Sequence, residues 1–121
     1  MADEVTERII GAAIEVHRVL GCGLLESVYE GALCHELFLR GVDFKRQVDV
    51  TVIYKDANVG NQRIDMLVAD RVVVELKSQR AMPEAAAAQV LSYLKATGLK
   101  RGLLLNFGEV RLIDGIKRFS L

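Results

Sequence analysis

The sequence Val72-Val73-Val74-Glu75-Leu76-Lys77 decides how this chain folds. Three consecutive valines followed by further apolar positions are typical of a strand in the middle of a sheet. Such a strand should continue apolar, yet it carries Glu75 and Lys77, which are two residues apart and therefore share one face. A second acid, Asp65, interrupts the mostly apolar run of residues 63–68. Because charges in apolar strands are costly unless they are paired or bind a metal, these three residues form the candidate site.

The connection between the two strands determines whether the acids meet. Residues 69–71 form a three-residue connection, which in a hairpin would place Val68 opposite Val72 and therefore Asp65 opposite Glu75. Directly opposed side chains lie roughly 5 Å apart at Cβ, and two carboxylates that close repel each other unless a cation lies between them. A two-residue turn would instead put the acids on opposite faces. The alternative interpretation is an ordinary ion pair with Lys77 on a solvated face of the sheet.

The periodicity of the rest of the chain predicts a mixed sheet flanked by helices. Apolar residues at three-four spacing indicate helices, glycines mark their ends, and alternating residues indicate strands. The predicted elements, in order, are helices over residues 5–20 and 25–40, strands over 47–54, 62–68 and 72–78, a helix from Pro83 to about Thr97-Gly98, a strand at 103–105 and an additional edge strand at 110–113.

Length and composition favour one folded domain over residues 1–121. Hydrophobic residues make up 51% of the chain, which excludes a disordered protein. The mean hydropathy of +0.24 is high for a small monomer and leads us to expect a homodimer. No apolar run is long enough to cross a membrane, and the N-terminus lacks a signal-peptide pattern, so a cytoplasmic location is expected. Cys22 and Cys34 form no metal-binding pair and are interpreted as reduced and structural.

The charge distribution is compatible with a nucleic-acid partner. The formal net charge is zero, but residues 1–60 hold 6 basic and 10 acidic side chains, whereas residues 61–121 hold 10 and 6. Nucleic-acid-binding proteins usually carry a basic face. The asymmetry permits such a face, although an imbalance of this size is common in other enzymes too.

The chemistry that suits two acids and a lysine is metal-assisted hydrolysis. Carboxylate oxygens select Mg²⁺ or Mn²⁺, which keep several water molecules when bound. A bound metal ion lowers the pKa of its water and stabilises charge that grows on a phosphate. A nearby lysine can orient the nucleophile or hold the scissile phosphate.

At these residues the sequence resembles the PD-(D/E)XK nucleases. Asp65, followed after nine residues by Glu75-Leu76-Lys77, is similar to their D…(D/E)XK signature, and Gly23-Leu24-Leu25-Glu26-Ser27-Val28-Tyr29 matches the motif of the small GxxExxY family in that superfamily. The resemblance covers nearly the whole chain. It implies a PD-(D/E)XK (restriction-endonuclease-like) fold, with a mixed central sheet flanked by helices. It also implies Mg²⁺- or Mn²⁺-dependent cleavage of nucleic acid, with DNA as the expected substrate.

The resemblance assigns roles to residues around the two strands. Asp65 and Glu75 correspond to metal ligands, and the carbonyl of Leu76 corresponds to a further ligand. Lys77 corresponds to the catalytic lysine. Glu26 corresponds to the helix acid that often completes such sites.

The resemblance is less complete at the expected substrate contacts. Gln89 and Tyr93 resemble the QxxxY element of exonuclease-type members, where this pair supports the site and contacts DNA, and Arg63 is expected to contact substrate as well. Ile64 stands where the superfamily name has Pro, and Ala86 stands where a His is frequent. The DNA contact is therefore less supported than the metal site.

Simpler interpretations exist for several of these residues. Glu26 can be a first-turn acid favoured by the helix dipole, Tyr29 and His17 can be core residues, and Gln89 can be a solvent-facing residue. At the level of function, the alternatives to a nuclease are a nucleic-acid- or protein-binding module on a nuclease fold, and a purely structural ion-pair network. Metal binding separates the nuclease from the structural network, and cleavage separates it from the binding module.

Overall fold

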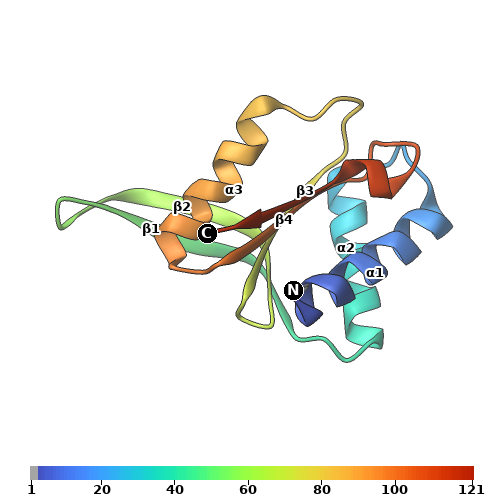
Figure 1. The fold of residues 1–121 in the computed structure, drawn as a ribbon, viewed down its shortest axis with the longest axis horizontal. Helices are drawn as coiled ribbons and strands as arrows, with labels where there is room; N and C mark the ends of the chain where they lie inside the picture. The colour runs from blue at the N-terminus through green and yellow to red at the C-terminus, as the bar shows by residue number, and fades with distance from the viewer. Residues whose placement is uncertain (1–2) are drawn as a thin grey trace.

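The computed structural model describes residues 3–121 and is built around a five-stranded mixed sheet (Figure 1). The spatial order of the strands, β1-β2-β3-β4-β5, is also their order along the chain. Neighbouring strands are antiparallel except β3 and β4, which are parallel because helix α3 crosses between them. The strands are β1 (Phe44–Tyr54), β2 (Ala57–Val68), β3 (Val72–Lys77), β4 (Arg101–Asn106) and β5 (Ile116–Ser120).

Helices cover both faces of the sheet, as Figure 1 shows. Helices α1 (Glu4–Leu20) and α2 (Glu26–Leu39) pack on one face, and α3 (Glu84–Thr97) packs on the other. Two separate apolar cores result. The core beneath α1 and α2 includes Met66, Val68, Val74, Leu76 and Phe107, and the core beneath α3 includes Val50, Ile64, Val73, Tyr93 and Leu104. This architecture confirms the predicted fold class.

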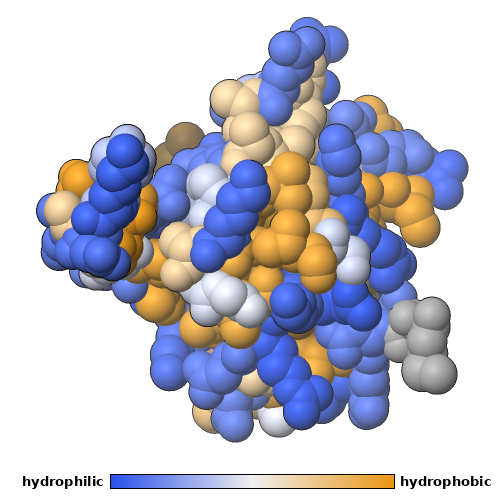
Figure 2. Space-filling model, turned by 60° about the vertical axis from the view of Figure 1, so that its left-hand side comes forward, coloured by the Kyte–Doolittle hydropathy of each residue, from blue (hydrophilic) through white to orange (hydrophobic). Residues whose placement is uncertain are grey.

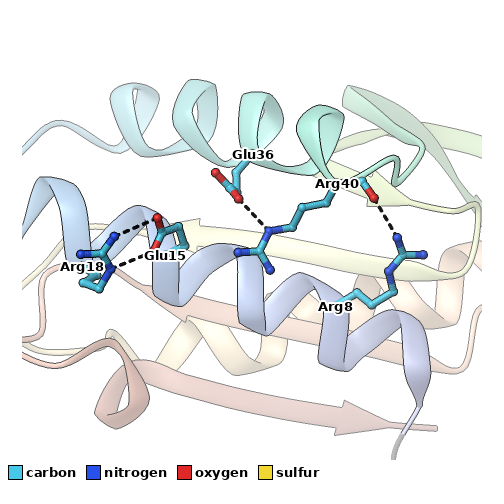
Figure 3. Close-up of polar contacts among 5 residues, drawn as sticks. All are labelled: Arg8, Glu15, Arg18, Glu36 and Arg40. Atoms are coloured by element: carbon cyan, nitrogen blue, oxygen red, sulfur yellow. Dashed lines mark hydrogen bonds and ion pairs between the residues drawn. The ribbon is translucent and has the colours of Figure 1, made fainter.

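Surface polar contacts join the two helices of the first layer (Figure 3). Nη2 of Arg8 in α1 donates a hydrogen bond to the carbonyl of Arg40, just after α2, at 2.9 Å. Arg40 in turn pairs with Glu36 at 2.7 Å, and Arg18 pairs with Glu15 at 2.8 Å within α1. Exposed ion pairs of this kind contribute little to stability, because water and salt screen them. The helix pair therefore depends mainly on its buried apolar face.

The hairpin between β2 and β3 has the predicted register. Val68 lies opposite Val72, and Ala69 and Asp70 turn the chain with φ angles of 54° and 53°. Strand pairing continues only from Val68–Val72 to Met66–Val74. Beyond that point β2 and β3 no longer form a ladder, and the acids lie where the pairing ends.

The predicted edge strand at residues 110–113 is wrong. Residues Leu112–Gly115 form a short 3₁₀ helix, η1, and the edge strand is β5, which follows it. Leu112 turns inward to the core beneath α1 and α2. Gly115 packs so closely against β4 that a Cβ atom would lie 2.4 Å from the carbonyl oxygen of Asn106. These tertiary contacts override the local alternation of residues 110–113.

Other boundaries differ from the prediction by a few residues. Strand β1 begins at Phe44, and the turn after it is limited to Lys55-Asp56, both with positive φ. Strand β2 therefore begins at Ala57. Pro83 immediately precedes the first residue of α3.

Hydrophobic side chains also reach the surface. Figure 2 shows them in patches between polar side chains. Examples are Ile53, Tyr54 and Val59 near the tip of the β1–β2 hairpin, which are each about 60% exposed. Over the described part of the chain, no helix has the length and apolar character needed to cross a membrane.

Candidate metal-binding and catalytic site

The acid and the lysine of β3 lie side by side, shielded from solvent. Nζ of Lys77 lies 3.6 Å from Oε2 of Glu75, and their side chains are 19% and 5% exposed. Glu75 and Lys77 lie two and four residues after Val73, which packs in the core beneath α3. Because every second side chain of a strand points to the same face, both residues lie on the α3 face of the sheet. The spacing that predicted a common face for Glu75 and Lys77 agrees with this arrangement.

Asp65 is held against the backbone of β3. Its Oδ2 accepts a hydrogen bond from the backbone N–H of Leu76 at 2.8 Å. The bond occurs just beyond the last ladder pair, Met66–Val74. In a regular strand pair, the N–H of Leu76 would donate to a backbone carbonyl. Here the Asp65 carboxylate accepts that hydrogen bond instead, which fixes it next to Glu75.

The electrostatics of the site disfavour two free negative charges. Burial and the negative charge of Asp65 together raise the pKa of Glu75 to about 8, although the positive charge of Lys77 opposes the shift. Within residues 3–121, Oε1 of Glu75 is buried without a hydrogen-bond partner. A buried carboxylate oxygen in this position lacks a donor or a cation, and either would stabilise its charged form.

Glu26 approaches the same acids from α2. It is the first residue of that helix, and its side chain lies at the surface. Partial burial raises the pKa of Glu26, the negative charge of Asp65 raises it further, and the positive charge of Lys77 lowers it. The structure thus brings Glu26 within electrostatic reach of Asp65 and Lys77.

The loop before Glu26 is held in place by Tyr29. The Tyr29 hydroxyl donates to the carbonyl of Gly21 and accepts from the N–H of Leu24. Its ring is fully buried and stacks on Phe107 with centroids 4.6 Å apart. The hydroxyl of Ser78, next to Lys77, donates to the carbonyl of Leu24 at 2.7 Å. Tyr29 is therefore a core residue whose hydroxyl fixes the loop that carries Glu26.

Helix α3 places Tyr93 and Gln89 on the other side of the acids. Tyr93 is only 2% exposed. Burial, together with the negative charges of Glu75 and Asp65, raises its pKa to about 12, and a hydrogen bond with the Gln89 side chain opposes the shift. Gln89 is half-buried one helical turn before Tyr93. This pair is thus placed to support the acids, and a direct contact with DNA stays a prediction.

Arg63 and His17 do not join this group. The guanidinium of Arg63 is exposed on β2 and pairs with Asp49 of β1 at 3.1 Å. Continued pairing of β2 with β3 would have placed Arg63 opposite Lys77, but the pairing ends at Met66–Val74. His17 is buried, and its Nε2 lies 2.8 Å from the carbonyl oxygen of Glu109. The interpretation of His17 as a core histidine agrees with this contact.

Asn106 contributes to the site in a way that the sequence analysis missed. It lies opposite Lys77 at the end of β4 and is fully buried. Its Oδ1 accepts from the N–H groups of Gln79 and Gly108 at 3.0 Å each, and its Nδ2 donates to the carbonyl of Gln79 at 2.8 Å. Asn106 therefore fixes the chain just after Lys77. A polar residue directly after Leu103-Leu104-Leu105 was the signal that could have identified it.

The residues present fit a metal centre that relies on few protein ligands. Over residues 3–121, no three His, Cys, Asp or Glu side chains gather closely enough to hold a metal ion by themselves. Asp65 and Glu75 supply two carboxylates, and the Leu76 carbonyl is a third possible ligand. Because Mg²⁺ usually keeps several waters and binds through one or two carboxylates, this donor set suits it. The unpartnered oxygen of Glu75 agrees with that fit.

Together, the mixed sheet and the acids at the end of the β2–β3 pairing define a nuclease-like α/β protein. The sequence matches the family model of the PD-(D/E)XK nuclease superfamily over residues 3–119, and the chain therefore belongs to that superfamily. No curated protein and no solved structure was found to match the chain.

Proposed function

We propose that this protein is a Mg²⁺-dependent nuclease of the GxxExxY family, with residues 1–121 acting as one domain. It would hydrolyse phosphodiester bonds in nucleic acid, with DNA as the expected substrate. The observation that carries the proposal is the buried, unpartnered Oε1 of Glu75, in a site that also contains Asp65 and has Nζ of Lys77 3.6 Å from Oε2 of Glu75. Superfamily membership supports the same chemistry.

Asp65, Glu75 and the carbonyl of Leu76 would hold Mg²⁺ or Mn²⁺. When bound, such an ion lowers the pKa of a coordinated water and stabilises negative charge on the phosphate. The two carboxylates supply the charge that attracts the ion. The bond from Leu76 to Asp65 keeps that carboxylate oriented before the ion arrives.

The remaining residues would hold the substrate and move protons. Lys77 would bind the scissile phosphate as a point charge. Glu26, whose raised pKa lies closer to neutrality than that of a free glutamate, would accept a proton from the attacking water. Gln89 and Tyr93 would support the acids from α3. Arg63, exposed on β2, would contact the nucleic-acid backbone away from the scissile bond.

A non-cleaving binding module is the second candidate. It is favoured by the absence, over residues 3–121, of a group of three metal-binding side chains. In that case the fold would bind nucleic acid or a protein partner, and the acids would serve only structure or weak ion binding.

Metal binding and cleavage test the proposal. Calorimetry with Mn²⁺ should show binding to the wild type, and Asp65→Asn should abolish it because a ligand charge is lost. Asp49→Asn is the matched control, since Asp49 is an exposed acid that pairs with Arg63 outside the site. Single-stranded, duplex and branched DNA and RNA should then be tested for cleavage with and without a chelator. Metal binding without cleavage would favour the binding module, and no Mn²⁺ binding would contradict the nuclease.

A further inference from the structure

At Asp65, the apolar side chains of strand β2 switch from one face of the sheet to the other. Met66 and Val68 pack in the core beneath α1 and α2, whereas Ile64 packs in the core beneath α3. Regular alternation would keep Ile64 and Met66 on one face. The backbone therefore rotates between them, at Asp65.

Strand β1 changes face at the matching position, Gln47. Phe44 packs against the core beneath α1 and α2, whereas Val48 packs against the core beneath α3. Gln47 and Asp65 both lie between the pairs Arg46–Met66 and Val48–Ile64. Gln47 has a φ of 51°, which is uncommon for a residue with a side chain. Such conformations cost about 1–3 kcal/mol and persist where the surroundings enforce them.

Glu30 of α2 contacts strand β1 at this change of face. The residue is only 8% exposed. Its Oε1 accepts from Nε2 of Gln47 at 2.8 Å, and its Oε2 accepts from Nε and Nη2 of Arg46 at 3.1 and 2.9 Å. Both carboxylate oxygens of Glu30 are therefore used on β1, at and next to the residue with positive φ.

We propose that Glu30 is a positioning residue for the candidate site. By fixing Gln47 it holds the rotated backbone of β1, and through the β1–β2 pairing it aims the Asp65 carboxylate at the N–H of Leu76. Glu30 also lies one helical turn after Glu26 on α2. The same helix therefore carries Glu26 itself and the residue that orients Asp65. This inference deepens the proposed function, yet the orientation of Asp65 can be measured without any metal ion.

Hydrogen exchange of the Leu76 amide, in the metal-free protein, measures that orientation directly. Asp65→Ala should speed this exchange by removing the acceptor of the N–H. Glu30→Ala should also speed it about tenfold or more, because local opening becomes easier. Gln47→Ala removes the other end of the contact and should have the same effect. Glu30→Gln keeps an acceptor for Gln47 and should retain most of the protection.

Two comparisons separate positioning from general stabilisation. The amide of Val74, inside the ladders to both β2 and β4, is the internal reference. Glu36→Ala is the matched variant, since it removes another α2 acid that pairs with an arginine away from the site. If Glu30→Ala speeds exchange at Leu76 and Val74 equally, or leaves Leu76 protected, the positioning role is refuted.

Mn²⁺ affinity gives the second readout and rests on the proposed function. Glu30→Ala should weaken Mn²⁺ binding roughly 10- to 100-fold, as loss of a group that orients a metal ligand usually does, and Glu36→Ala should not. If the wild type binds no Mn²⁺, the proposed function fails while the exchange result still decides the role of Glu30. If Mn²⁺ binds equally to wild type and Glu30→Ala, the positioning role is refuted instead.

Discussion

Lys77 holds its ammonium nitrogen 3.6 Å from Oε2 of Glu75, and both side chains are largely shielded from solvent. The positive charge of Lys77 nevertheless does not offset the effects that favour the neutral form of Glu75. Burial and the charge of Asp65 together raise the pKa of Glu75 to about 8 despite the neighbouring lysine. One positive charge among these acids therefore does not keep Glu75 ionised at neutral pH in the metal-free protein.

The first prediction concerns the pH dependence of stability. The unfolded chain releases the Glu75 proton near its ordinary pKa of 4.5, whereas the folded protein keeps it until about pH 8. Between these values the folded state binds more protons than the unfolded state, so the free energy of unfolding should fall as pH rises. Glu75→Gln cannot titrate and should escape this loss. Relative to the wild type, its melting temperature should rise by several degrees between about pH 5 and about pH 8.

Thermal unfolding in the presence of a chelator provides the measurement. Adding Mn²⁺ at the higher pH should reverse the ranking, because the ion stabilises the ionised wild-type site but not the amide. A constant difference in melting temperature between the two proteins across this pH range would show that Glu75 does not titrate with a raised pKa.

The second prediction concerns the hydroxyl of Tyr29. Tyr29→Phe keeps the stacking on Phe107 but removes the bonds to Gly21 and Leu24. We expect a loss of about 1–2 kcal/mol in the free energy of unfolding, because two hydrogen bonds to partly buried backbone groups are lost. Urea denaturation measures the loss. Tyr54→Phe is the control, since Tyr54 is 61% exposed, and equal effects of the two substitutions would contradict the role of Tyr29.

The third prediction concerns Asn106. Asn106→Ala removes three hydrogen bonds and leaves the N–H groups of Gln79 and Gly108 and the carbonyl of Gln79 unsatisfied. The expected destabilisation is about 2–4 kcal/mol, measured by urea denaturation, since three hydrogen bonds worth roughly 0.5–1.5 kcal/mol each are lost. Asn61→Ala on the exposed part of β2 should change stability little. A small effect at Asn106 would mean that the chain after Lys77 is held in another way.

Much of the central hairpin could be predicted because local rules determine it. The three-residue connection sets the Val68–Val72 register, and the alternation along β3 puts Glu75 and Lys77 on one face. The amphipathic patterns of α1 and α2 likewise gave boundaries within one residue of those observed. In these segments the local pattern and the tertiary packing agree.

The parts that could not be predicted depend on contacts between distant segments. Arg63 misses the site because the pairing of β2 with β3 ends at Met66, and the rotation at Asp65 is fixed by Glu30 through Gln47 of a different strand. The position of β5 similarly depends on the close approach of Gly115 to Asn106. No periodicity within one segment encodes contacts of this kind.

The fourth prediction concerns assembly. We expect a homodimer, because the chain exposes several large apolar side chains and β1 is an 11-residue strand at the edge of the sheet. Ile53, at the exposed end of β1, is 60% exposed. Light scattering should give the mass of two chains, and Ile53→Lys should shift it toward one. Val110→Lys, at an exposed site on a different segment, is the control, and a wild type that is monomeric at micromolar concentration would contradict the prediction.

The last prediction concerns Lys77 in the proposed reaction. Its ammonium group lies beside the acids without being a metal ligand, so Lys77→Ala should leave Mn²⁺ binding largely intact. Cleavage should nevertheless fall about a hundredfold or more, because a charge that stabilises the transition state is lost. Lys77→Arg retains the positive charge but replaces a compact ammonium with a planar group in a half-buried position, so we expect only partial activity. Single-turnover cleavage at saturating Mn²⁺, with affinities measured by calorimetry, separates the two effects. If Lys77→Ala cleaves as fast as the wild type, Lys77 serves the Glu75 ion pair and not the reaction.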